Sequence, residues 1–333
     1  MSNKLLCGKN VPRIGLGCMG MSEFYGKSDD QHSVNLLSEA FELGYRHFDT
    51  ADMYGRGHNE KLLSTFLSKL SAEQRAEIVL ASKVGIVRDP VKKYSLSFDN
   101  SYDYIKNSCE QSLKRLNVEC IDLYYLHRLA PDQNLEEVLS VFSDLIKEGK
   151  IKSMGLCEVS AEVLEQANAI QRISAIQSEY SLWSRGVEEE VLPMCKKLNI
   201  PLVGFSPLGR GILTGEITKE VMSLAKEEED LRTRLPRFSG ENLDNNIKLI
   251  EEFGKVAASQ HILKSQLSLA WLLAQSDLVH VIPGTRKSQY LRDNFSAQSI
   301  HLTDNVVEEL SQLFVPSAIH GDRYPSAISP NIS

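Results

Sequence analysis

The chain alternates short runs of β-branched and other apolar residues with longer segments in which apolar residues recur at helical spacing. This alternation is typical of parallel strands joined by crossover helices. We expect strands at Arg13–Leu16, Tyr45–Phe48, Ile78–Ser82, Ile121–Leu126, Ser153–Leu156, Ser174–Gln177, Leu202–Phe205 and Val279–Ile282. We expect helices at Asp30–Leu43, Asn59–Leu70, Tyr102–Leu116, Leu135–Glu148, Ala161–Ile170, Val187–Leu198, Asn245–Ala274 with a break, and Ser288–Ala297.

Residues that favour helix ends support these boundaries. Gly44 and Gly149 follow apolar-periodic segments, as a left-handed C-terminal cap would, and Ser160 stands where an N-cap belongs. No polar linker divides the eight strand–helix units, so the pattern predicts an α/β fold, a closed (β/α)8 barrel formed by one domain over residues 1–333. An open doubly wound sheet is the alternative.

Three segments depart from a bare barrel. Long loops follow the third strand, at Gly85–Ser101, and the seventh, at Gly209–Asn246. Both loops leave the carboxyl ends of strands, where loops often act as lids or hold a cofactor. The alternative is that they are mobile surface loops without a role in the site. After a last expected helix at Asp304–Leu313, the tail over about 316–333 is too rich in Pro and Ser to be helical.

Composition excludes several classes of protein. With 333 residues, 42% apolar and 24% charged, the chain is expected to fold rather than remain disordered. Lys and Arg number 37 against 44 Asp and Glu, a net charge of -7, which argues against nucleic acid as a partner. The longest apolar stretch, Leu267–Ala274, is far shorter than a membrane span. The N-terminus lacks a signal-peptide pattern and the six cysteines form no CxxC pair, so we expect a cytoplasmic protein, with the nucleus also possible. The oligomeric state is left open.

Gly15, Gly17 and Gly20 match GxGxxG, the fingerprint of a dinucleotide-binding Rossmann fold. The sequence that follows, MSEFYGKSD, does not open a helix, and no acidic residue ends a second strand as the fingerprint requires. We therefore interpret these glycines as a tight strand end near a ligand or another backbone segment.

Four ionisable residues fall at or just after predicted strand ends. Asp49 ends the second strand, Tyr54 follows it, Lys83 ends the third and His127 ends the fourth. Taken singly, each residue has a structural alternative. Asp49 could cap the next segment and Tyr54 could be a core aromatic. Lys83 could form an ion pair at the barrel rim, and His127 could be a core histidine. Jointly they predict an active site, because the carboxyl ends of barrel strands meet around one cavity.

The chemistry of these groups suits proton donation to a carbonyl oxygen. An adjacent ammonium, Lys83, is expected to lower the pKa of the Tyr54 phenol toward the working range. Asp49 would orient that ammonium, and His127 could donate a hydrogen bond to the carbonyl oxygen. With hydride from a nicotinamide, the product would be an alcohol.

These residues resemble the aldo-keto reductases. GYRHFDTADMYG is similar to that family's first signature and LYYLHR to its fourth-strand segment, and Asp49, Tyr54, Lys83 and His127 match its catalytic tetrad. The resemblance runs from IGLGCMG to GDRYP; SPLGRGILTG, LSLAWLLAQ and IPGTRKSQYLRDN resemble the long-loop branch that holds aryl-alcohol dehydrogenases and pyridoxal reductases.

The resemblance implies a nicotinamide cofactor extended across the barrel mouth. Gln177 would hydrogen-bond its carboxamide, and Phe205, just before Ser206 and Pro207, would stack on its ring. Cys157 and Glu158 stand where the family usually has Ser followed by Asn or Glu, so carboxamide anchoring is expected to be looser. Cys157 as a catalytic nucleophile is a competing interpretation.

Phosphate binding is assigned to two clusters after the seventh and eighth strands. Thr285, Arg286 and Lys287 combine a hydroxyl and two cations beside a helix N-terminus, which favours NADPH over NADH. Asn294 could contact adenine. The alternative for Arg286 and Lys287 is a solvated helix start without a ligand. The complete set of expected cofactor-binding residues is Met19, Cys157, Glu158, Gln177, Phe205, Ser206, Leu208, Gly209, Arg210, Gly211, Gly284, Thr285, Arg286, Lys287, Gln289 and Asn294.

The sequence defines the substrate only as a small carbonyl compound. The substrate pocket is expected to draw on Met19, Tyr25, Met53, Tyr54, His127 and Arg128. Arg323 or Tyr324 would meet an anionic group or lie on the surface. Pyridoxal reduction is one alternative, and a non-catalytic redox sensor that keeps the cofactor is another. A metal-dependent hydrolase using Asp49, His127 and Glu179 is disfavoured, because no HxH pair completes a ligand set and no metal is expected.

Overall fold

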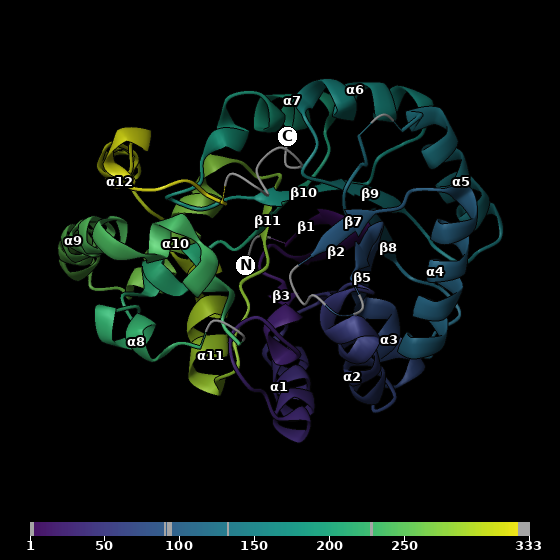
Figure 1. Cartoon of the computed structure of the whole chain (residues 1–333), viewed down its shortest axis with the longest axis horizontal. Coiled ribbons are helices and arrows are strands. Elements are labelled where there is room, and N and C mark those ends of the chain that lie inside the picture. Colours follow the sequence, from purple (N-terminus) through teal and green to yellow (C-terminus); the bar gives the residue numbers. More distant parts are fainter. Residues whose placement is uncertain (1–2, 90, 92–94, 132, 227–228, 326–333) are drawn as a thin grey trace.

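The computed structural model describes residues 3–89, 91, 95–131, 133–226 and 229–325. Within them, eight parallel strands form one sheet in the order β3-β4-β5-β8-β9-β10-β11-β12 (Figure 1). These strands are β3 (Leu16–Gly17), β4 (His47–Asp49), β5 (Val79–Val84), β8 (Leu123–Leu126), β9 (Met154–Cys157), β10 (Ala175–Glu179), β11 (Leu202–Phe205) and β12 (Val279–Val281).

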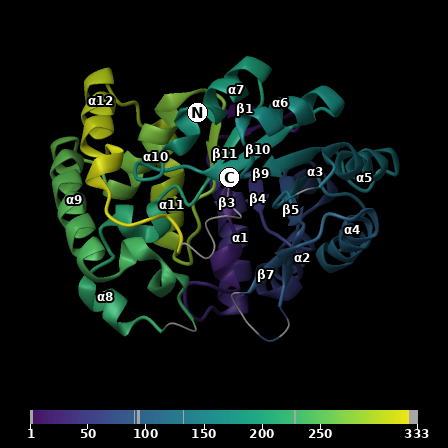
Figure 2. The ribbon, with the colours of Figure 1, turned by 45° about the horizontal axis from the view of Figure 1, so that its top comes forward.

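Helices surround this sheet on its outer side (Figures 1 and 2). Their apolar faces pack on the outward side chains of the strands in one large core cluster. The helices are α1 (Asp30–Leu43), α2 (His58–Leu67), α3 (Ala72–Glu77), α4 (Tyr102–Leu116), α5 (Leu135–Lys147), α6 (Ala161–Ile170), α7 (Val191–Leu198), α8 (Lys219–Leu224), α9 (Gly240–Ser259), α10 (Lys264–Gln275), α11 (Ser288–Ser296) and α12 (Asp304–Leu313).

The first and last strands meet, so the sheet closes into a barrel. The amide of Gly15 donates to the carbonyl of Val281 at 2.8 Å, and the amide of Val281 donates to the carbonyl of Arg13 at 2.8 Å. This closure confirms the (β/α)8 barrel. A side chain at Gly17 would stand 2.7 Å from the Ile282 carbonyl oxygen, so glycine is required there by a close approach of two backbones. No α-helix opens at Gly20, because α1 begins at Asp30.

The predicted helix ends are largely confirmed. Gly44 caps α1 with a φ of 107°, and Ser160 caps α6 by accepting a hydrogen bond from the Val163 amide. The break expected within Asn245–Ala274 falls near residue 260, between α9 and α10, and α9 begins five residues earlier than expected, at Gly240. Strand boundaries differ from the expectation by at most three residues, and β11 matches it at both ends.

Short antiparallel hairpins were not predicted from the sequence. A hairpin of β1 (Asn3–Leu6) and β2 (Lys9–Pro12) precedes the barrel, and its Leu6 and Val11 pack with inward-facing strand residues such as Val79 and Val203. The strands are four residues long and rich in Lys and Asn, which hides the period of two.

Both long loops contain ordered elements rather than irregular chain alone. The first holds the hairpin of β6 (Ile86–Arg88) and β7 (Leu96–Phe98), and the second holds α8 and the start of α9. In the tail, Pro316–Ala318 forms one turn of 3-10 helix, and the chain from 326 onward lies outside the described residues. Within the part of the chain that the structure describes, no helix has the length and apolar character needed to cross a bilayer.

Two histidines are buried inside the barrel wall and predict a pH effect on stability. His47 and His280 have no hydrogen-bond partner for either ring nitrogen among the described residues. Burial lowers the pKa of each to about 3. The unfolded chain binds these protons below about pH 6.5, while the folded protein does not until about pH 3. Stability should therefore fall as the pH drops through this window, by about 1.4 kcal/mol per pH unit for each histidine.

Urea unfolding between pH 7.5 and pH 5 checks this prediction. The His280→Gln variant should lose stability less steeply than the wild type as the pH falls, because it lacks one of the buried imidazoles whose pKa is lowered. Identical slopes for the two proteins would contradict the assignment.

Candidate active site

The four residues singled out at strand ends meet at one edge of the barrel. Asp49 is the last residue of β4, Lys83 lies near the end of β5, and His127 follows β8 directly. Tyr54 begins a short 3-10 helix, Tyr54–Gly57, after β4. Because β4, β5 and β8 are neighbours in the sheet, their carboxyl ends bring these side chains together.

Lys83 is the centre of this group. Its Nζ donates to Asp49 Oδ1 at 2.5 Å, to the Thr50 carbonyl oxygen at 2.8 Å and to the Tyr54 hydroxyl oxygen at 3.3 Å. The other Asp49 oxygen, Oδ2, accepts a hydrogen bond from Gln177 Nε2 at 2.8 Å. The Lys83 side chain is fully buried and that of Asp49 is 3% exposed, so both charges are largely removed from solvent and each has its partner close by.

Burial governs the acid–base properties of the site. It raises the pKa of Tyr54 to about 12, although the Lys83 ammonium pulls that pKa down. Lys83 thus lowers the pKa of Tyr54, as expected, but desolvation raises it by more. The sequence alone does not show how deeply Tyr54 is buried and so does not predict the net direction. Burial alone would lower the pKa of Lys83, but Asp49 and Tyr54 raise it above its usual value. Tyr54 is thus a neutral phenol and Lys83 an ammonium at neutral pH.

His127 stands beside Tyr54, with the two ring centroids 6.0 Å apart and the planes at 83°. Burial and the nearby charges of Lys83 and Arg128 lower the pKa of His127 well below its usual value. The imidazole is therefore neutral at physiological pH and lines the pocket as a hydrogen-bonding group.

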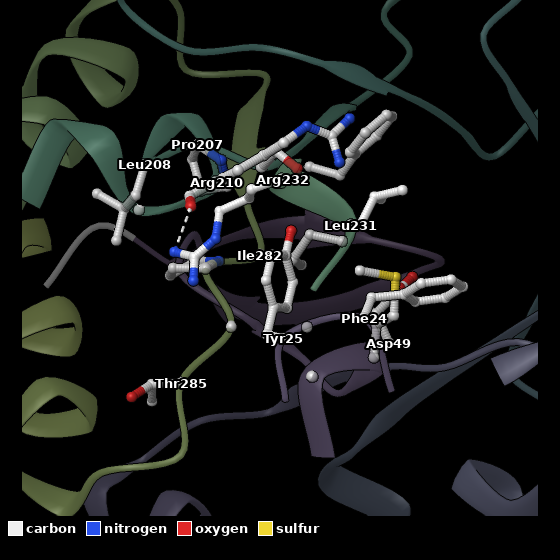
Figure 3. A pocket seen from close by; sticks show the side chains of 18 of the residues that line it. Phe24, Tyr25, Asp49, Pro207, Leu208, Arg210, Leu231, Arg232, Ile282 and Thr285 are labelled. Carbon is white, nitrogen blue, oxygen red and sulfur yellow. Dashed lines mark hydrogen bonds between the residues drawn. The ribbon is translucent and has the colours of Figure 1, made fainter. Parts of the chain in front are cut away.

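A cavity of about 1350 Å³ opens above these residues (Figure 3). It exceeds the usual 300 to 1,000 Å³ of a single small-ligand pocket, which leaves room for a cofactor and a substrate. Most of the expected cofactor-binding residues line it: Met19, Cys157, Gln177, Phe205, Ser206, Leu208, Arg210, Gly211, Gly284, Thr285, Arg286, Lys287 and Asn294.

Three of the expected cofactor residues do not line this cavity. Glu158 accepts hydrogen bonds from the Glu179 amide at 2.6 Å and from Arg323 at 2.7 Å. Gly209 packs under Trp183, and Gln289 is exposed and donates to Asp293 at 2.8 Å. Contacts to a cofactor from these three positions stay predictions.

Arg286 is held by backbone carbonyls. Its guanidinium donates to the carbonyl oxygens of Tyr25 at 2.7 Å, Gly26 at 3.4 Å and Lys27 at 2.6 Å. It therefore anchors the loop after β3. Phosphate binding by Arg286 would require some of these hydrogen bonds to be exchanged.

Two loops that the sequence did not connect meet at the pocket. The Leu231 amide donates to the Phe24 carbonyl at 2.9 Å, and the Gly26 amide donates to the Glu229 carbonyl at 3.1 Å. Arg232 lies over the Tyr25 ring at 5.5 Å, and both side chains face the cavity (Figure 3). Phe24, Leu231 and Arg232 had no signal in the sequence, because the contact joins segments about 200 residues apart.

The described part of the tail binds the barrel through charged groups. Arg323 donates to Glu158 and Glu179, and the Tyr324 hydroxyl accepts from Arg210 at 2.8 Å. Glu179 also accepts from Arg210 at 3.1 Å. Burial would raise the pKa of Glu179, but the two arginines hold it at about 2. Glu179 is thus committed to an ion-pair cluster and does not join Asp49 and His127.

Comparison with known proteins agrees with this geometry. The family model described as "Aldo/keto reductase family" matches residues 13–314. The chain belongs to this family. Aldo-keto reductase yakc [NADP(+)] from Schizosaccharomyces pombe is 38% identical over 97% of this chain and 94% of its own length.

Further relatives extend the comparison. Probable aldo-keto reductase 1 from Glycine max is 37% identical, over 95% of this chain and 89% of its own. The solved glycerol dehydrogenase AKR11B4 from Gluconobacter oxydans superimposes with a TM-score of 0.84 at 25% identity, covering 95% of this chain and 96% of that one. The aldo-keto reductase fold is therefore present over nearly the whole chain.

Proposed function

We propose that this aldo-keto reductase uses NADPH to reduce aldehydes or ketones to alcohols, with Tyr54 as the proton donor. The observation that carries the proposal is the contact of the Tyr54 hydroxyl with the buried Lys83–Asp49 pair at the floor of the large cavity. The relative from S. pombe, which is named for NADP(+), supports the choice of cofactor.

The cavity has groups that suit the two ends of NADPH. Gln177 donates to Asp49 and lines the cavity together with the half-buried Phe205; these two would hold the carboxamide and the face of the nicotinamide ring. Thr285 and Lys287 precede α11, and Lys287 has no carboxylate partner among the described residues, so both are available to a phosphate. Asn294 lines the same end and would contact the adenine. The residues present therefore fit this cofactor.

The mechanism follows from the protonation states. Bound NADPH supplies hydride to the carbonyl carbon. The Tyr54 phenol gives its proton to the carbonyl oxygen, and the Lys83 ammonium stabilises the phenolate that remains. Asp49 keeps Lys83 protonated and oriented, and neutral His127 donates a hydrogen bond that stabilises negative charge developing on the carbonyl oxygen.

The walls beside Tyr54 favour apolar or planar carbonyl compounds. Phe24, Met53 and Ile86 form a small cluster with Tyr54, and Phe98 and Leu231 pack against it. Aromatic aldehydes fit such walls. Reduction of pyridoxal specifically is a narrower form of the proposal, and a non-catalytic redox sensor that retains the cofactor is the alternative.

A screen that follows the absorbance of NADPH or NADH at 340 nm tests the proposal. Benzaldehydes, including 4-nitrobenzaldehyde, small dicarbonyls and pyridoxal are offered with NADPH and, separately, with NADH. We expect oxidation of NADPH by at least one aldehyde, faster than oxidation of NADH. If NADPH binds but no aldehyde is reduced, the redox-sensor alternative is favoured. Prior chelation should change nothing for a reductase and would inactivate a metal-dependent hydrolase.

Arg286 gives a second test of the cofactor assignment. The Arg286→Ala change should weaken NADPH binding much more than NADH binding, because only NADPH carries the extra phosphate that a guanidinium can bind. Dissociation constants from fluorescence titration check this. Equal losses would count against phosphate recognition and would assign Arg286 to holding the loop of Tyr25, Gly26 and Lys27.

A further inference from the structure

Arg128 follows His127 directly and lines the same cavity. Its backbone is fixed by Asn100, whose side-chain amide donates to the Arg128 carbonyl at 3.1 Å and accepts from the Ala130 amide at 2.6 Å. Asn100 is itself 3% exposed. The base of the Arg128 side chain is therefore held in place at the carboxyl end of β8.

Most N–H groups of the Arg128 guanidinium make no hydrogen bond to the described residues. Within the described residues its one hydrogen bond runs to the His127 carbonyl oxygen at 2.6 Å, and no carboxylate lies within ion-pair distance. Other pocket arginines are committed: Arg210 pairs with Glu179, and Arg232 pairs with Asp230. Arg323, which the sequence offered for an anionic group, is taken by Glu158 and Glu179.

Arg128 also stands apart from the groups assigned to the cofactor phosphates. Those groups follow β11 and β12, whereas Arg128 follows β8, and β9 and β10 lie between. Its charge lies close enough to the reactive end to lower the pKa of His127 and to oppose the burial that raises the pKa of Cys157. Arg128 therefore lines the cavity next to His127, apart from the strand ends assigned to the cofactor phosphates.

We propose that Arg128 binds an oxyanion carried by the substrate, so that preferred substrates are aldehydes or ketones bearing a carboxylate or phosphate group. This inference rests on the proposed carbonyl reduction. A planar guanidinium offers paired donors to such a group, and the apolar walls formed by Phe24, Phe98 and Leu231 receive the rest of the molecule.

Pairs of anionic and neutral substrates test the inference and distinguish a carboxylate from a phosphate as the group that Arg128 binds. The first pair is 4-carboxybenzaldehyde and methyl 4-formylbenzoate, and the second is pyridoxal 5′-phosphate and pyridoxal. We expect the wild type to prefer the anionic member of at least one pair by 10-fold or more in kcat/KM. Preference in the first pair alone identifies a carboxylate, and preference in the second alone identifies a phosphate. No preference in either pair overturns the proposal.

The Arg128→Gln variant tests the residue itself. Its kcat/KM for the preferred anionic substrate should fall about 10- to 100-fold through a higher KM, with less than threefold change for the neutral partner and for the Kd of NADPH. Equal losses for both members, or a matching loss of NADPH affinity, would overturn the proposal. Arg56→Gln is the matched control, because Arg56 is exposed and its guanidinium likewise donates to one backbone carbonyl, that of Asp89. An equal effect in this control would mean general electrostatics and would also overturn the proposal.

A binding measurement keeps this test independent of turnover. Calorimetry of 4-(hydroxymethyl)benzoate and of pyridoxine 5′-phosphate with protein saturated in NADP⁺ should show at least one of them bound to wild type and about 10-fold or more weaker in Arg128→Gln. Unchanged binding overturns the role of Arg128. If the wild type reduces neither neutral nor anionic aldehydes, the proposed function fails, whereas reduction of neutral aldehydes without anionic preference contradicts the inference alone.

Discussion

Replacing Tyr54 by phenylalanine is expected to lower kcat for aldehyde reduction by about 100-fold or more, with little change in NADPH affinity. In the proposed mechanism the phenol is the acid that protonates the carbonyl oxygen, and its pKa of about 12 keeps the proton on it at neutral pH. The ring itself packs with Phe24, Met53 and Ile86, and phenylalanine preserves that packing. Steady-state kinetics with 4-nitrobenzaldehyde and fluorescence titration of NADPH measure the two quantities.

A second tyrosine serves as the control. Tyr102 lies exposed on α4, and its hydroxyl donates to Asp144 at 3.2 Å, remote from the cavity. Tyr102→Phe removes the same hydroxyl group and should leave kcat unchanged. A fall of less than 10-fold in Tyr54→Phe would be too small for loss of the general acid and would assign proton donation to another group.

The Lys83→Met variant should lose both activity and stability. The phenolate left after proton transfer would have no ammonium at 3.3 Å, so we expect kcat to fall by about 100-fold or more. Asp49 would remain buried with the Gln177 amide as its remaining side-chain hydrogen-bond donor, and breaking a buried ion pair costs about 3 to 5 kcal/mol. Chemical denaturation and steady-state kinetics measure the two effects.

The double variant Asp49→Asn, Lys83→Met separates these effects. It leaves neither charge buried, so much of the lost stability should return, while activity should stay low because the ammonium is absent. A double variant no more stable than Lys83→Met would contradict a compensated buried pair. Full activity in either variant would contradict the role of Lys83 beside Tyr54.

The sequence was sufficient for the barrel and for the gathering of its ionisable groups. Each strand is a short apolar run, and Asp49, Lys83 and His127 stand where such runs end, so the rule that parallel strand ends share one edge brought them together. Tyr54 follows its strand by five residues and was within reach of the same edge. Their catalytic roles stay predictions until the variants are measured.

Other features depend on contacts between distant segments and had no local signal. The carbonyls that hold Arg286 come from a loop about 260 residues earlier, and the arginine that holds Glu158 comes from the tail. The pKa of Tyr54 reflects how completely the folded chain excludes water from it. The hairpins β1–β2 and β6–β7 are too short for a clear alternation of apolar and polar residues. The extent of the domain over residues 1–333 also stays a prediction.

The most direct test of carbonyl reduction at this site is a single turnover with NADPH that carries deuterium at both hydrogen positions of C4 of the nicotinamide. Protein in excess over 4-nitrobenzaldehyde is mixed with the labelled cofactor, and the alcohol is analysed by mass spectrometry and NMR. We predict one deuterium on the carbinol carbon, formed rapidly by wild type and about 100-fold or more slowly by Tyr54→Phe. Alcohol without deuterium, no alcohol at all, or equal rates in the two proteins would contradict hydride transfer assisted by Tyr54.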